Sequence, residues 1–422
     1  MEKLAKIWKI PELRNSILFV LGMLAIFRVA AHIPIPGVDP VALQQFFASN
    51  EILGLLNIFS GGGMENFSIV LMGVGPYITS SIIFQLLAML IPKLEEMNKE
   101  EAGRQKVNMW TRWATVPFAA LQAYAMISLL RNTGAGIIGA LSPFDYVSII
   151  ATTTAGTILL MWIGELISER KIGNGISLLI FAGIVASLPT AIQQFMVNYD
   201  PSMLFLLIGF LVIVIVTIVG VVLINEGQRN VPVQYARQMR GHRTFGGSTT
   251  HLPLRVNMAG VIPIIFAISV LLFPSMAAQF FVNATSPTLA QAAQWIIAVF
   301  QDQFVYGISY FILVFAFTYF YTEIVFHPTQ IAENLQKQGG FIPGIRPGRH
   351  TSDYLAQTTH KIIFIGALFL AIIAILPLVM KYFTGIDSLA VGGTSLLIVV
   401  SVVIDVVKQI ESQMSMREYS MD

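Results

Sequence analysis

Long, unbroken runs of hydrophobic residues recur along the whole chain, separated by shorter polar segments. A helix that crosses a bilayer needs about 20 predominantly apolar residues, whereas strands of a membrane β-barrel show segments of about ten residues with alternating polarity. The runs here are continuous and too long for such strands. The pattern predicts an all-α integral membrane protein with ten transmembrane helices, at Ser16–Ile33, Leu71–Ile91, Trp113–Leu130, Val147–Ile167, Ile176–Phe195, Met203–Ile224, Met258–Phe280, Phe304–Phe326, Ile362–Met380 and Leu389–Val407.

The basic residues test this number of spans independently, because cytoplasmic loops collect Lys and Arg. Of the 25 Lys and Arg residues, all but three lie before the first run, after the last, or in alternate connections between runs. The exceptions are Arg131 and Lys381, in connections predicted to lie outside, and Arg28, within the first span. Adding or removing one span would destroy this alternation. We therefore expect both termini in the cytoplasm.

Ten spans divide into an N-terminal half, residues 1–200, and a C-terminal half, residues 201–422, each with five helices. Two similar halves with an odd number of helices run in opposite orientations, a layout found in many transporters. Two predicted inside loops, at 226–255 and 327–360, are several times longer than the connections of about 2–8 residues usual in compact bundles. Their charges either set the topology only or form a binding surface, and long loops more often bind something.

The segment at 57–68 is glycine-rich, lies on the predicted outer side and leads directly into the second span. One interpretation is an ordinary external loop. The other is a short re-entrant helix lodged in a funnel, because irregular backbone is tolerated at membrane depth only where protein or a cavity surrounds it.

Composition narrows the possible functions. The 422 residues are 55% hydrophobic and 11% charged, against about 25% charged in soluble domains, which excludes a soluble enzyme. The net charge of +2 suggests no nucleic-acid partner, and with no cysteine there is no disulfide or thiolate metal site. No nucleotide, zinc-protease or nucleophile motif is visible. The sequence thus predicts no enzyme, cofactor or metal site, and leaves a small-solute transporter as the alternative to a channel.

Polar side chains within the spans bear on that alternative. Ion-coupled transporters usually have ionisable residues near the bilayer midplane, but Glu165, Glu323 and Asp405 fall near span ends. Neutral polar residues inside or at the start of spans include Thr79, Gln85, Gln122 and Asn257. They either bond neighbouring helices or together form a latch between two sides of the bundle, and spacing alone leaves both open.

Several sequence blocks, in one order along nearly the whole chain, resemble the SecY family, the channel subunits of bacterial protein translocases. These blocks are Gly75–Ile82, Gly173–Ser177, Ile180–Ile184, Glu226–Arg229, His251–Pro263, Pro343–Gly348 and Gly392–Ile398. The resemblance implies two five-helix halves around a central pore, closed by an aliphatic ring and plugged from outside. The implied function is to conduct unfolded preproteins with signal sequences across the bacterial plasma membrane, and membrane segments laterally into it.

The resemblance also implies residue roles. The ring matches Val74, Ile78, Ile180, Ile184, Ile265 and Ile398, and the plug matches Phe59, Gly61, Gly62, Gly63 and Phe67. A lateral gate between spans two and three and spans seven and eight places Thr79, Gln85, Gln122 and Asn257 near its seam. The long loops match the docking surface for a SecA-like motor ATPase and the ribosome, with Arg240, Arg243, Arg346 and Arg349. SecE-like and SecG-like membrane subunits are the expected partners in the lipid bilayer.

Overall fold

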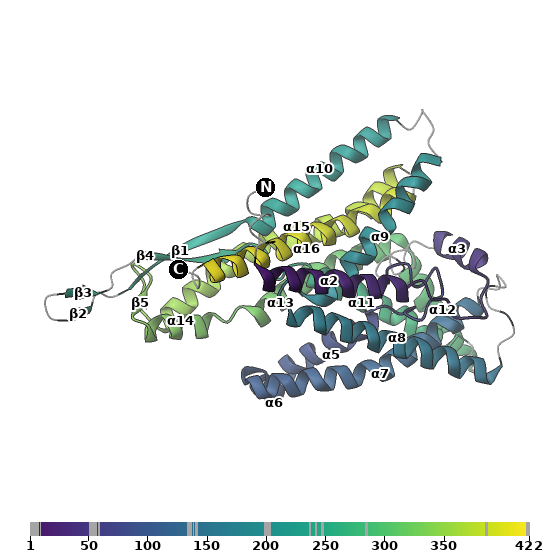
Figure 1. Ribbon diagram of the computed structural model, residues 1–422, viewed down its shortest axis with the longest axis horizontal. Coiled ribbons are helices and arrows are strands. Elements are labelled where there is room, and N and C mark those ends of the chain that lie inside the picture. The colour runs from purple at the N-terminus through teal and green to yellow at the C-terminus, as the bar shows by residue number, and fades with distance from the viewer. Residues whose placement is uncertain are drawn as a thin grey trace.

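The computed structural model describes residues 8, 10–49, 57, 60–132, 137, 139, 142–197, 204–235, 238–240, 243–245, 249–282, 286–384 and 387–418. Its helices run mostly along the long axis of the molecule, and a small sheet projects from one end (Figure 1). We call this the sheet end, and we call the opposite end, where the segment at 60–74 lies, the plug end.

Ten long helices fall on the ten predicted spans, and the prediction of a helical membrane fold is confirmed. They are α2 (Pro11–Ala30), α5 (Gly75–Leu90), α7 (Glu101–Asn132), α8 (Pro143–Glu169), α9 (Gly175–Val197), α10 (Leu204–Glu226), α11 (Ile262–Gln279), α13 (Gln303–Val325), α15 (Arg349–Thr384) and α16 (Asp387–Glu418). Within the described ranges, seven helices are by themselves long and apolar enough to cross a membrane. An eighth span results if α5 and α6 (Pro92–Lys99) are joined across a bend of 111°.

The second and seventh spans begin later than the hydrophobic pattern predicts. α5 starts at Gly75 rather than Leu71, and α11 starts at Ile262 rather than Met258. In both places the apolar residues before the helix are in turns, and a proline follows at the start of the helix. Leu71 is buried within its turn. Hydropathy therefore detects the burial of these residues but not their backbone conformation.

Besides α6, the described residues form three more short helices that were not predicted. α3 (Pro40–Ser49) and α12 (Pro287–Gln301) lie towards the plug end, whereas α14 (Pro328–Lys337) lies at the sheet end (Figure 1). Each begins at a proline, whose fixed φ and missing N–H suit the first helical position. All three are shorter than the apolar length that a span requires.

The sequence predicts that the two long connections are loops, but both contain strands. β1 (Gln228–Tyr235) pairs antiparallel with β4 (Thr249–Arg255) and, at its far end, with β5 (Gly340–Phe341) from the second connection. A separate hairpin joins β2 (Gln238–Arg240) to β3 (Arg243–Phe245) at the tip of the sheet end (Figure 1). The two connections therefore fold together into one surface.

A small core lies beneath this sheet. Val231 and Val233 alternate inward along β1. They pack with buried side chains of β4, α14 and α15 and with Ile342, which follows β5: Leu254, Leu335, Ile342 and Leu355 belong to the same cluster. The main core lies within the helical bundle and includes residues from both predicted halves. The start of α2 packs on the end of α16 through Ile10, Leu13 and Met414. The division into residues 1–200 and 201–422 stays a prediction.

Candidate functional site

The six predicted ring residues are all buried in the main core of the bundle. Four of them, from three separate stretches of chain, line one cavity of about 50 Å³: Val74, Ile78, Ile180 and Ile265. Ile184 is one helical turn from Ile180 on the same face of α9, and Ile398 is on α16. A space of this size holds a few water molecules at most. The bundle is therefore closed here by branched aliphatic side chains.

The glycine-rich segment lies directly against this constriction. Ser60 and Met64 line the same cavity as the ring residues and are themselves buried. Both lie in the segment 57–68 that the sequence singles out, but sequence reasoning did not name them among the plug residues, although Met64 is apolar in a polar, glycine-rich stretch. Sequence reasoning also missed Ile268 and Leu272, which share this cavity and lie on one face of α11 with Ile265.

The predicted re-entrant helix does not extend over residues 60–68, because residues 60–74 form consecutive turns, whereas Asn57 is helical. Gly61 and Gly62 have φ of 71° and 80°, values that glycine reaches at little cost and an α-helix does not use. The alternative of an ordinary external loop does not fit either, since Ser60, Met64 and Phe67 are buried. Phe59 lies outside the described residues.

Backbone contacts fix where this segment leaves the core. The N–H of Ile35 donates to the Phe67 carbonyl at 2.8 Å, and the N–H of Ile69 donates to the Ile33 carbonyl at 3.0 Å. A Cβ placed on Gly61 would lie 2.5 Å from Phe27 Cζ and 3.3 Å from Gly183 Cα. Only glycine therefore fits between α2 and α9 at this point.

The four polar residues predicted at the lateral seam do not all meet. Gln122 of α7 donates from Nε2 to Thr79 Oγ1 of α5 at 3.4 Å. Gln85 instead donates to Ser81 within α5, at 3.0 Å. Asn257 donates to Asn225 Oδ1 of α10 at 2.7 Å and so bonds on another side of the bundle.

The helices on the two sides of the predicted seam are in contact. Both α5 and α7 pack against α11. Near the plug end, the rings of Tyr124 on α7 and Phe280 at the end of α11 stack with centroids 5.4 Å apart and an angle of 18° between their planes. The two sides of the predicted seam are therefore in direct contact in this structure.

The predicted docking residues lie at the sheet end. Arg346 and Arg349 are exposed. Arg346 sits in a turn between Gly344 and Gly348, whose φ values are 82° and 93°, and its carbonyl accepts a hydrogen bond from Thr351 Oγ1 at 2.9 Å. Arg240 and Arg243 are opposite one another in the β2–β3 pair, and their side chains lie outside the described part of the chain.

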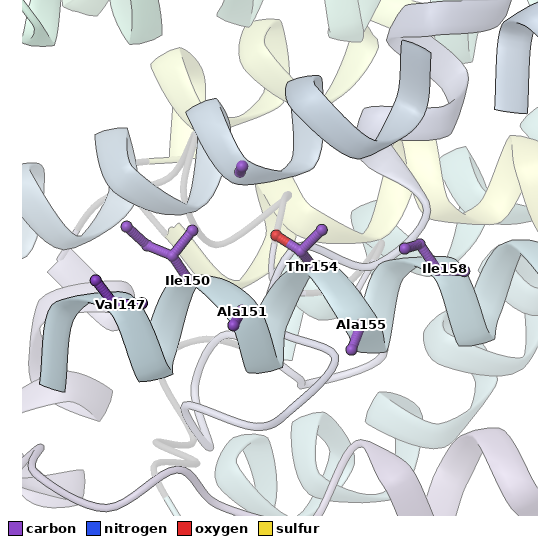
Figure 2. A pocket seen from close by; sticks show the side chains of 7 residues that line it. Val147, Ile150, Ala151, Thr154, Ala155 and Ile158 are labelled. Atoms are coloured by element: carbon purple, nitrogen blue, oxygen red, sulfur yellow. The ribbon is translucent and has the colours of Figure 1, made fainter. Parts of the chain in front are cut away.

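A larger apolar groove is separate from this site. It has a volume of about 420 Å³ and runs along one face of α8, as Figure 2 shows, and Ala120 of α7 also lines it. Its lining residues are Ala120, Val147, Ile150, Ala151, Thr154, Ala155 and Ile158, and none of them belongs to the ring, the plug segment or the seam. Lipid or a neighbouring helix fills such surfaces of membrane helices.

Comparisons with known proteins agree with this architecture. The model of the SecY family matches residues 68–407. The protein translocase subunit SecY of Halalkalibacterium halodurans is 42% identical over 427 residues, which cover 99% of this chain and 98% of that protein. The corresponding subunit of Corynebacterium glutamicum is 42% identical over 443 residues, covering 99% of each.

Two solved structures share the fold at 16% sequence identity. Each match covers 93% of this chain and 91% of the chain in the solved structure. One concerns a SecY protein whose plug domain stabilises the closed state of the translocation channel and maintains a membrane seal, with a TM-score of 0.59. The other is Sec61 in a canine ribosome–channel complex, with a TM-score of 0.56.

The long helices around a buried aliphatic core, together with the match to protein translocase subunits over nearly the whole chain, identify a protein-conducting channel. The chain belongs to the SecY family of multi-pass proteins of the bacterial plasma membrane. This assignment does not favour the alternative of a small-solute transporter.

Proposed function

We propose that the constriction is the seal of a channel that passes unfolded preproteins across the membrane and releases membrane segments laterally into it. The single observation behind this proposal is the small cavity that ring residues such as Ile78 and Ile265 share with Ser60 and Met64 of the glycine-rich segment. We call residues 57–68 the plug. In the resting channel the plug sits on the ring, and it leaves when a preprotein enters.

The chemistry of the ring suits this role. A polar lining would keep water and conduct ions, whereas a short apolar constriction closes by dewetting. Branched aliphatic side chains can also close around an extended chain of any sequence without binding it, because their contacts have no direction. A preprotein can then pass while the leak of ions stays small.

The lateral gate is proposed between α5 and α7 on one side and α11 and α13 on the other. The stacked Tyr124 and Phe280 rings support this, since they join the two sides without a hydrogen bond or an ion pair. A hydrophobic signal sequence replaces such contacts with similar ones of its own. The Thr79–Gln122 bond keeps α5 and α7 together on one side of the seam.

The sheet end is proposed to face the cytoplasm, together with both termini, because 22 of the 25 Lys and Arg residues follow the predicted inside pattern. Its exposed Arg346 and Arg349 then form a docking surface for a SecA-like motor or the ribosome. The chain itself is proposed to have no enzymatic activity, so the energy comes from that partner. SecE-like and SecG-like subunits complete the complex in the bilayer.

Reconstitution tests the function directly. Vesicles containing the translocase with the full-length chain are mixed with a motor ATPase, ATP and a secretory precursor, and precursor protected from added protease is measured. We expect protected precursor only with ATP and only when this chain is present. Vesicles that accumulate small solutes but never protect precursor would contradict the proposal.

Orientation has its own test, because the native chain has no cysteine. A cysteine at Gln105, on the exposed surface of α7, should react in intact cells only with a membrane-permeant thiol reagent. One at Thr288, exposed on α12, should also react with an impermeant reagent. The opposite result at either position would overturn the proposed topology.

A further inference from the structure

Arg28 is one of the three basic residues outside the predicted charge pattern, and the one that lies within a predicted span. It is in the last turn of α2, towards the plug end, and its side chain is partly buried. Its Nη1 donates a hydrogen bond to the carbonyl of Gly61, 33 positions later in the chain. A charged side chain of the first helix thus bonds directly to the backbone of the plug.

Neighbouring residues of the same helix turn contact the plug as well. Phe27 packs so closely on Gly61 that no Cβ fits there. The carbonyl of Ala31, one turn after Phe27, accepts a hydrogen bond from Asn66 Nδ2 at 3.4 Å. The end of α2 therefore contacts the plug at both of its sides, around Gly61 and around Asn66.

These contacts differ in kind from those on the ring. The ring residues that share the cavity with the plug are aliphatic, so their contacts fix no orientation. The hydrogen bonds that the structure describes between residues 60–67 and more distant parts of the chain all end on Arg28, Ala31 or Ile35. Orientation of the plug thus comes from the end of α2 and the residues just after it, and Arg28 is the charged member of this set.

We infer that Arg28 is a positioning residue that latches the plug in the closed channel, an inference that rests on the proposed role of the plug. A hydrogen bond from a charged donor is stronger than one between neutral groups, and the effect increases where water is excluded. When the plug leaves, water enters the funnel and hydrates the guanidinium, so the latch is reversible. Loss of the charged bond should shift the balance towards the displaced plug by about tenfold or more.

A thiol at Met64 reports the position of the plug. Met64 is 4% exposed and faces the ring cavity, so Met64→Cys should react slowly with an impermeant maleimide added on the plug side of translocase vesicles. Adding Arg28→Leu should raise the labelling rate by about tenfold, with a matching rise in resting ion conductance. Arg28→Lys, which keeps a charged donor, should restore most of the slow rate.

Controls separate a local latch from a damaged fold. Arg131→Leu removes another arginine at the plug end, one that bonds Tyr146 instead, and should leave Met64→Cys labelling unchanged. Thr288→Cys, exposed on α12, should react at the same rate with and without Arg28→Leu. An equal rise in labelling for Arg28→Lys and Arg28→Leu would overturn the latch, since the charged donor would then not matter.

The plug and the latch can fail separately. If an engaged motor and precursor do not speed the labelling of Met64→Cys in the otherwise unchanged chain, the plug assignment is wrong. If they do, but Arg28→Leu leaves the resting rate unchanged, the plug assignment stands and the latch is overturned.

Discussion

The constriction and the sheet-end surface, proposed for sealing and docking, have opposite chemistry. The constriction is built from buried aliphatic side chains such as Ile78 and Ile265, contributed by separate helices. The sheet-end surface presents exposed arginines on a short turn, with Gly344 and Gly348 in left-handed conformations on either side of Arg346. Contacts at the constriction are non-directional packing contacts between aliphatic side chains. At the sheet end, the turn holds charged groups in a defined position.

This difference predicts how each site tolerates change. Contacts between aliphatic side chains are many and individually weak, so a ring of six loses its seal gradually as members are replaced. A charge that meets a complementary partner acts as one group, and placing a like charge there costs several kcal/mol. Single substitutions should therefore have larger effects on docking than on sealing.

The largest effect is expected for Arg346→Glu. Charge reversal at this exposed position should lower motor-driven translocation by about a hundredfold, because repulsion replaces attraction at the docking surface. Insertion and resting ion conductance should stay unchanged, since Arg346 lies outside the membrane core. Translocation into vesicles and planar-bilayer currents measure the two quantities. Normal translocation by a correctly inserted variant would mean that this arginine serves only topology.

The ring should fail more gradually. Ile78→Ser together with Ile265→Ser should raise resting ion conductance by about tenfold, because hydroxyl groups keep water in the constriction, and should relax the requirement for a strong signal sequence. The matched control is Leu211→Ser with Ile215→Ser on α10, whose side chains are 53% and 51% exposed. A ring variant that stays as tight as this control in planar bilayers would show that these side chains are not the seal.

Packing beneath the docking turn offers a way to separate charge from support. Leu355 is fully buried under the sheet with Ile342, and Leu355→Ala should destabilise this small core by about 2–5 kcal/mol. Translocation should fall several-fold, less than for Arg346→Glu, while resting conductance stays at the native value. Protease sensitivity of the residue 226–255 connection measures the loosening. A rise in conductance would show that the two sites are not independent.

The smallest effect is expected at the seam. Gln122→Leu removes the 3.4 Å bond to Thr79, and hydrogen bonds between membrane helices contribute about 0.6 kcal/mol on average. Opening towards lipid should become easier by about threefold, measured by cross-linking of a weakly hydrophobic signal sequence to lipid. Gln85→Leu is the control, because Gln85 bonds only within α5. Equal effects of the two substitutions would mean that the loss of a polar side chain matters, and not the hydrogen bond between Gln122 and Thr79.

Hydropathy and charge predict the spans well because both follow directly from the bilayer. They do not reveal the sheet, since Val231 and Val233 alternate over too few residues within a polar connection and the β5 partner comes from a distant segment. Spacing also cannot tell that Asn257 bonds Asn225 rather than the seam, or that Arg28 reaches Gly61. These contacts depend on how the helices pack against one another, and residue spacing in a single sequence does not reveal that packing.

The length of α15 has a mechanical consequence. From Arg349 to Leu376 the helix has 28 residues without a proline, and at 1.5 Å per residue it is a rod of about 42 Å. Its first turn follows directly on the arginine turn, and further along it packs against α13 and α16. If a partner pushed on this turn, the stiff helix would carry the displacement into the bundle, next to α16, which contains Ile398.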